Sequence, residues 1–191
     1  NVKPEINNDR RRFMLTAASV AGAVWIAPAA MSSASTSAST DTNAGSDERD
    51  LKLATLDDAL SELAALVQNG EPASSATWNW AQTLTHCAQS IEFSLAGFPQ
   101  PKPELFQRTI GAAAYEVFAW RGRMTHDLAE PIPGAPSLEG VVDAAAAEIR
   151  LRASIAAFQQ WQGEFRPHFA YGELSREEYE LAHAMHLASH F

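Results

Sequence analysis

The chain has 191 residues, of which 46% are hydrophobic and 9% aromatic. That is enough for one compact domain with a core and too little for two ordinary domains. The formal net charge of -9 argues against a nucleic-acid partner, which requires a basic face, and against docking on anionic lipids. A single cysteine, Cys87, excludes an intrachain disulfide and a cysteine-based zinc site.

Residues 1–30 are predicted to be an export signal. The segment 9–15 (DRRRFML) resembles the twin-arginine (Tat) motif, with an aspartate where the motif usually has serine or threonine. The apolar run over residues 15–27 is too short to span a bilayer as a mature helix, and residues 27–29 are small enough for signal-peptidase cleavage. We therefore expect a periplasmic protein with no stable membrane insertion. The alternative is an amphipathic N-terminal helix.

Residues 31–50 are rich in serine, alanine and threonine and contain no large apolar residue after Met31. Such a stretch buries too little surface to offset the entropy lost on ordering. It is predicted to be a disordered linker, which leaves residues 51–191 as the folded domain.

The rest of the chain has helical periodicity. Leucines recur at three- and four-residue spacing over residues 53–66, and Gly70 follows them. A second helix is expected over residues 77–96, where an apolar stripe is followed by Gly97.

Three further helices are predicted: one over residues 103–122, one from Ser137 to Gly163, and a last one that opens with the capping box Ser175–Glu178. The proline-rich segment 131–136 cannot be regular structure. Tryptophan and phenylalanine residues at helical spacing are expected in the core. Five helices with short to medium connections predict an all-α bundle.

The last predicted helix carries a stripe of histidines. His183, His186 and His190 fall within an arc of about 60° on a helix. The i, i+4 spacing of His186 and His190 lets both imidazoles reach one point beside the helix, an arrangement typical of a metal site. The alternative is a solvated helix end that is rich in histidine.

A catalytic zinc ion usually has three protein ligands, so a third is needed. His86, at the rim of the apolar stripe of the second helix, is the candidate, although a half-buried histidine with a backbone partner is the alternative. His183 could be a ligand or could hydrogen-bond to one. His126 is interpreted as a cationic group at a helix C-terminus, with a place in the metal site as the alternative. His168 is interpreted as a solvated loop residue and Cys87 as a core residue.

These residues resemble a known group. A tryptophan-led helix with Leu84-Thr85-His86, followed by the final pair His186 and His190, resembles the DinB/YfiT-like superfamily of proposed metalloenzymes. Segments 85–99, 121–126, 131–136 and 172–179 resemble, more closely, a branch of it known only as a domain of unknown function. The resemblance covers residues 52–191.

The resemblance implies a four-helix up-down-down-up bundle, here with an additional short helix, that holds one divalent metal ion by His86, His186 and His190. Zinc or nickel is the expected ion, because imidazole suits both metals. Relatives commonly have two adjacent histidines near the last ligand, whereas Ser189 precedes His190 here.

By the same resemblance, the expected activity is hydrolysis or thiol S-transfer on a small molecule. No catalytic residue is assigned, and Tyr179 is the nearest polar candidate on the histidine face. The alternatives are a non-enzymatic helical bundle that binds a metal or a ligand, and a structural metal site closed by a fourth ligand such as His183. A homodimer is a further option.

Overall fold

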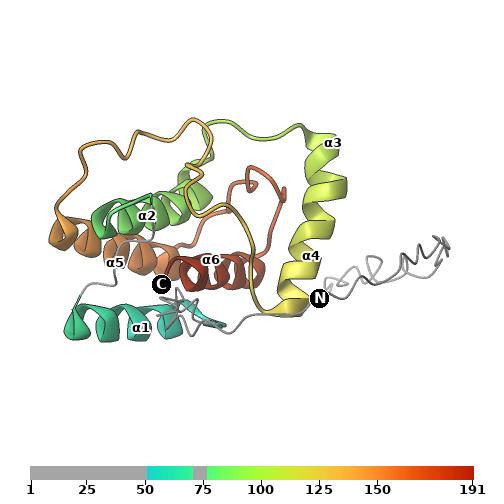
Figure 1. Cartoon of the computed structure of the whole chain (residues 1–191). Helices are drawn as coiled ribbons and strands as arrows, with labels where there is room; N and C mark the ends of the chain where they lie inside the picture. The colour runs from blue at the N-terminus through green and yellow to red at the C-terminus, as the bar shows by residue number, and fades with distance from the viewer. Residues whose placement is uncertain (1–50, 71–76) are drawn as a thin grey trace, which may run out of the picture. The chain divides into compact units, whose positions relative to one another are not determined.

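The computed structural model describes residues 51–70 and 77–191, so the predicted export signal and linker lie outside the described residues (Figure 1). The described chain is helical, which confirms the all-α prediction for this part. Its elements are α1 (Leu56–Asn69), α2 (Trp80–Ala96), α3 (Glu104–Phe106), the π-helical turn η2 (Gln107–Gly111), α4 (Ala112–Arg121), α5 (Ala144–Gln160) and α6 (Arg176–His190). Among these helices none has the length and hydropathy needed to cross a bilayer.

Side-chain caps define where three of the helices begin. Thr55 caps α1, Asn79 caps α2 and Ser175 caps α6, each in a reciprocal capping box with the residue three positions later. Each box satisfies backbone N–H groups that a helix start leaves without partners. The box at Ser175 confirms the predicted start of the last helix, and this start sets which face of α6 the histidines occupy.

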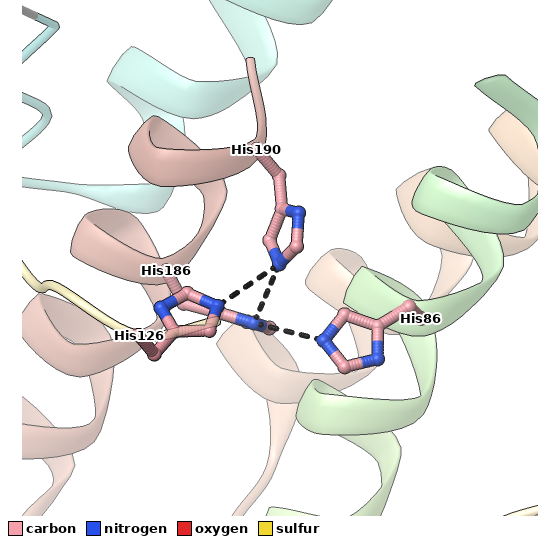
Figure 2. Close-up of side chains that lie close together, drawn as sticks. All are labelled: His86, His126, His186 and His190. Atoms are coloured by element: carbon pink, nitrogen blue, oxygen red, sulfur yellow. Dashed lines mark hydrogen bonds between the residues drawn. The ribbon is translucent and has the colours of Figure 1, made fainter. Parts of the chain in front are cut away.

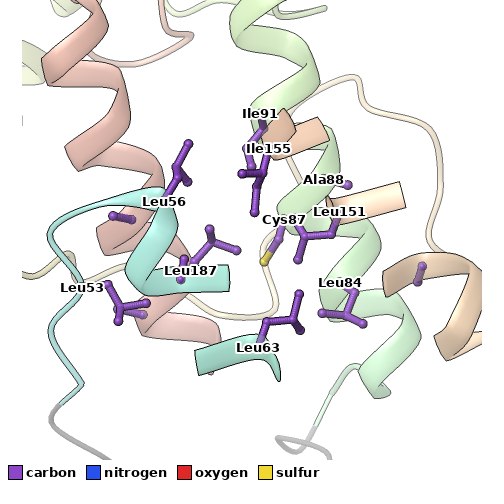
Figure 3. Packing of buried hydrophobic residues seen from close by; sticks show 14 of the residues in the cluster. Leu53, Leu56, Leu63, Leu84, Cys87, Ala88, Ile91, Leu151, Ile155 and Leu187 are labelled. Carbon is purple, nitrogen blue, oxygen red and sulfur yellow. The ribbon is translucent and has the colours of Figure 1, made fainter. Parts of the chain in front are cut away.

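The main core lies between α1, α2, α5 and α6. Helix α2 packs along α5 and also contacts α6, and α6 packs on α1. Figure 3 shows Leu56 and Leu63 of α1 facing Leu187 of α6, with Cys87 of α2 among these apolar side chains. Cys87 is fully buried, as expected of a core residue.

The predicted start of the fourth helix at Ser137 is wrong, because α5 begins at Ala144 with Asp143 as its cap. Two side chains at the start of α2 donate hydrogen bonds to carbonyl groups between Ser137 and α5. Asn79 Nδ2 donates to Val141 O and Gln82 Nε2 donates to Leu138 O, both at 3.0 Å. These contacts hold the segment before α5 against the start of α2, two parts of the chain that are far apart in the sequence.

The predicted third helix, 103–122, is present as α3, η2 and α4, with the π-helical turn in its middle. The described part of the chain covers one side of α4, where Tyr115 packs against Met185 of α6. As a result Trp120 is 85% exposed, and its expected place in the core is wrong. Figure 1 shows this stretch crossing the direction of α2 and α6.

Candidate metal centre

Four histidines converge on one point in the described chain: His86, His126, His186 and His190. Their candidate ligand nitrogens all lie within 4.8 Å of one another. Figure 2 shows the four rings turned inward from α2, from the segment after α4 and from α6. The Nε2–Nε2 distances are 3.1 Å from His86 to His186, 3.1 Å from His186 to His190 and 3.2 Å from His190 to His126.

Each ring is placed by a different local feature. His186 and His190 lie one turn apart on α6, so both project to the same side of the helix. His86 lies in the middle of α2, whose contact with α6 brings it opposite that pair. His126 follows the end of α4, where Gly122 adopts a left-handed conformation (φ 64°) and turns the chain out of the helix.

Hydrogen bonding alone does not account for this arrangement. A neutral imidazole Nε2 carries either one hydrogen or one in-plane lone pair. Yet His186 Nε2 and His190 Nε2 each contact two other Nε2 atoms. Ligands about 2.0–2.1 Å from one ion would lie about 2.9–3.4 Å apart at angles between octahedral and tetrahedral. The three close distances fall in that range, so the donor set fits a divalent transition metal.

The protonation states suit the same role. Burial, together with the neighbouring histidines, lowers the pKa of His86 to about 4 and that of His190 to about 2. Burial also lowers the pKa of His186 well below its ordinary value, and that of His126 falls although Glu130 and Asp127 oppose the shift. All four rings are therefore neutral at pH 7, the form in which imidazole binds a metal.

The outer nitrogens of two of these rings are unusual. The Nδ1 atoms of His86 and His126 are buried without a hydrogen-bond partner among the described residues. Metal-bound histidines usually donate from this nitrogen to a carboxylate or carbonyl, which orients the ring. Here Trp78 packs on the cluster, with its ring centroid 4.8 Å from that of His86 and 6.3 Å from that of His190. Aromatic packing therefore contributes to the orientation of these imidazoles.

A cavity of about 190 Å³ borders the cluster. His86, His126 and His186 form part of its wall, together with His168 and His183. Most of the remaining lining is apolar and includes Met124, the proline-rich loop at Pro131, Ile132 and Pro133, and the segment with Phe169 and Tyr171. Ser90, Lys102 and Glu130 add polar groups. A small molecule in this cavity would lie beside the histidine cluster.

The structure brings together the three histidines singled out in the sequence, and it adds His126. The interpretation of His126 as a helix C-terminal cation is wrong, because α4 ends at Arg121 and burial lowers the pKa of His126. The sequence signal that could have identified His126 as a ligand candidate is its position just after a glycine that ends a helix, since loops carry many binding residues. His86 is also more buried than a rim position suggests, at 2% exposure.

Three other sequence interpretations change. His183 lies outside the four-histidine cluster and lines the cavity instead. Tyr179 is fully buried and its hydroxyl donates to the carbonyl of Arg166, so it is not an available polar group on the histidine face. His168 was expected to be solvated but is 9% exposed, because aromatic side chains enclose it.

Helices around a four-histidine centre and an adjoining cavity define the class as an all-α protein with a candidate metal site. The family described as "Protein of unknown function (DUF1569)" matches residues 45–191, so the chain belongs to this family. This confirms the expectation of a domain of unknown function. Neither the curated proteins nor the solved structures include a match to the chain.

Proposed function

We propose that the four-histidine cluster binds one divalent metal ion, zinc or nickel, and that the protein is a DinB/YfiT-like metalloprotein. The convergence of four Nε2 atoms carries this proposal, because hydrogen bonds between imidazoles cannot satisfy it. The proposed arrangement of α1, α2, α5 and α6 is the up-down-down-up bundle of that superfamily, whose core these helices share.

We propose hydrolysis or thiol S-transfer on a small molecule as the activity. A divalent ion in the cluster would supply Lewis-acid activation of a water, thiol or ester. The chain supplies the neutral ligands, a largely apolar cavity that limits access of water, and space beside His86, His126 and His186. This cavity favours the enzyme over the alternative of a structural ion, since a closed structural site has no need of an adjoining chamber.

The role of His126 distinguishes an enzyme from a structural metal site. Four histidines around a tetrahedral zinc ion close the site, whereas an ion that accepts five or six ligands keeps open positions. His126 is the ligand candidate outside the helices, on the segment after α4. If it is a displaceable ligand, the enzyme is supported; if it is as necessary as the others, a closed structural site is supported.

The first test is the metal content of the parent chain beside single alanine variants of the four histidines. We expect about one equivalent of zinc or nickel in the parent protein and its loss in His86→Ala and His186→Ala, since each removes a ligand. His168→Asn serves as a control outside the cluster and should retain the metal. Absence of bound metal in the parent under replete conditions would overturn the proposal.

Coordination is read from the absorption spectrum of the cobalt(II)-substituted protein. In His126→Ala we expect retained cobalt with an altered spectrum, because a water would occupy the vacated position. Complete loss of cobalt in this variant would instead support a closed four-histidine structural site. The competing non-enzymatic function would then become the better description.

We also propose that the protein acts after twin-arginine export, on the basis of residues 9–15. Replacing Arg10 and Arg11 with lysine and following the exported fraction tests this.

A homodimer is proposed through the exposed apolar side chains of the α3–α4 stretch, which include Leu105, Ile110 and Trp120. Sedimentation of the parent chain and of Trp120→Glu tests that assembly.

A further inference from the structure

His168 lines the cavity together with Phe169 and Tyr171, and its own loop fixes which of its ring nitrogens accepts hydrogen bonds. His168 begins a tight turn in which its backbone exchanges two hydrogen bonds with Gly172, at 2.7 and 3.1 Å. Inside this turn the backbone N–H groups of Ala170 and Tyr171 both donate to His168 Nδ1, each at 3.2 Å. Nδ1 is therefore an acceptor and carries no hydrogen.

In the neutral ring the hydrogen must then be on Nε2. Burial, together with the nearby His183, lowers the pKa of His168 to about 3, so the ring is neutral at physiological pH. Among the described residues His168 Nε2 donates no hydrogen bond. It is also not one of the side-chain nitrogens that are fully buried without a hydrogen-bond partner. Because His168 lines the cavity, Nε2–H is the polar group of this ring that remains available to a ligand there.

Aromatic packing holds the ring in place. Tyr171 stacks on His168 at a centroid distance of 4.2 Å and an interplanar angle of 8°, and Phe98 meets it edge-on at 4.9 Å. A donor that is already oriented needs no reorganisation when an oxygen approaches. His168 therefore has the properties of a preorganised donor to a ligand oxygen.

The His168–Gly172 turn is hydrogen-bonded to the π-helical segment η2. Gln107 Nε2 donates to Phe169 O at 3.2 Å, and the backbone N–H of Lys102 donates to the same carbonyl at 2.7 Å. At Gly111 an added Cβ would lie 1.8 Å from Ala170 O, so only glycine permits this approach of the turn to the helix. Such π-helical turns are frequent at functional sites, and this one positions the segment that carries His168.

We propose that His168 Nε2–H binds an acceptor oxygen of the ligand, and that the ligand is a small apolar molecule, about the size of one aromatic ring, bearing a carboxylate or carbonyl. The apolar wall of Met124, Pro131 and Ile132 accepts the body of the molecule. An apolar cavity of about 150 Å³ is known to hold benzene, which makes the size of this cavity suitable.

The charges at the cavity do not by themselves select the ligand. Lys102 and Glu130 both line it and have opposite signs. The oxygen is inferred from the donor at His168, and a divalent ion in the four-histidine cluster would add further attraction for a carboxylate. This inference deepens the proposed function and rests on it, because the cluster forms the other wall of the same cavity.

The experiment measures binding of benzoate and of toluene to the full chain after loading with zinc, by NMR titration. His168→Asn is the test variant, because Asn Oδ1 can accept the turn's backbone N–H groups as Nδ1 does, while the Nε2–H donor is lost. We expect a decrease of about tenfold or more in benzoate affinity, the effect of losing one hydrogen bond to a charged group, with toluene affinity unchanged.

His168→Gln is the second variant, since its amide can place a donor near the former Nε2. We expect it to bind benzoate more tightly than His168→Asn does. Unchanged benzoate affinity in His168→Asn, an equal loss for both probes, or no benzoate binding to the parent protein would each overturn the proposal. Metal content is measured on the same samples, so that failure of the four-histidine centre is distinguished from failure of the His168 site.

Discussion

His183 is the histidine of α6 that does not join the four-histidine cluster. Its side chain is 2% exposed, stacks on Tyr179 and meets Phe158 edge-on, and its Nε2 has no partner among the described residues. Burial lowers its pKa to about 3. The ring is therefore neutral in the folded chain over most of the pH range in which an exposed histidine becomes charged.

This burial predicts an acid-dependent loss of stability. Below about pH 6.5 the unfolded chain binds a proton at His183 that the folded chain does not bind, so protonation favours unfolding. The free energy of unfolding should fall by about 1.4 kcal/mol per pH unit from this group alone, down to its folded pKa. His183→Phe removes the group, and the variant should lose less stability by that amount for each pH unit.

Urea unfolding between about pH 6 and about pH 4, with a chelator present so that metal-linked protons do not contribute, measures this slope. A second test is His168→Asn, which removes the other buried histidine outside the four-histidine cluster. It should reduce the slope in the same direction, because the pKa of His168 is also lowered. A slope identical to that of the parent chain in His183→Phe would contradict the prediction.

At the scale of elements, η2 connects the helical scaffold to the cavity. The turn widens the helix between α3 and α4 and places Gln107 and Gly111 against the His168–Gly172 turn. The contact needs the absence of a side chain at Gly111, since the nearest atoms of Ala170 belong to the backbone. Backbone atoms cannot move aside as a flexible side chain can.

Gly111→Ala should therefore displace the turn and the histidine that it carries. We expect a loss of about 1–3 kcal/mol in the free energy of unfolding, the usual range for overpacking. Benzoate affinity should also fall, although residue 111 does not line the cavity. The control is Ala113→Ser, an exposed position of α4, which should leave both quantities within about 0.5 kcal/mol of the parent values. Parent-like stability and binding in Gly111→Ala would show that the turn tolerates the added methyl group.

At the scale of the whole molecule, the histidine cluster joins parts of the chain that are distant in sequence. His86 and His186 are 100 positions apart, and His126 and His190 are 64 apart. An ion held by all four would cross-link α2, α6 and the segment after α4. Such an ion binds the folded chain in preference to the unfolded chain, so it raises the free energy of unfolding.

Removal of the ion should therefore lower the melting temperature. With free metal at about 1,000 times its dissociation constant, the stabilisation is about 4.1 kcal/mol, which for a chain of this size corresponds to roughly 10 °C. Calorimetry of the parent chain with and without chelator measures the shift. The shift should be abolished in His186→Ala and restored in the parent by re-addition of zinc. A melting temperature insensitive to chelator in a protein that contains metal would contradict the cross-link.

Local sequence patterns were enough to predict the helical class, the glycine ends of α1 and α2, the capped start of α6 and the shared face of His186 and His190. These properties depend on spacings of three or four residues, which a single helix expresses without help from the rest of the chain. The buried place of Cys87 follows from the same periodicity.

Which other groups join that face depends on how the helices pack. His126 reaches His190 because the chain leaves α4 at Gly122 and returns to α6, and no local periodicity predicts that return. The segment before α5 is held against the start of α2 by contacts from Asn79 and Gln82, and Trp120 is exposed because none of the described elements covers that side of α4. The donor role of His168 likewise arises from a turn that closes against η2. Each of these outcomes is a contact between segments far apart in sequence, and such contacts exist only once the helices have packed.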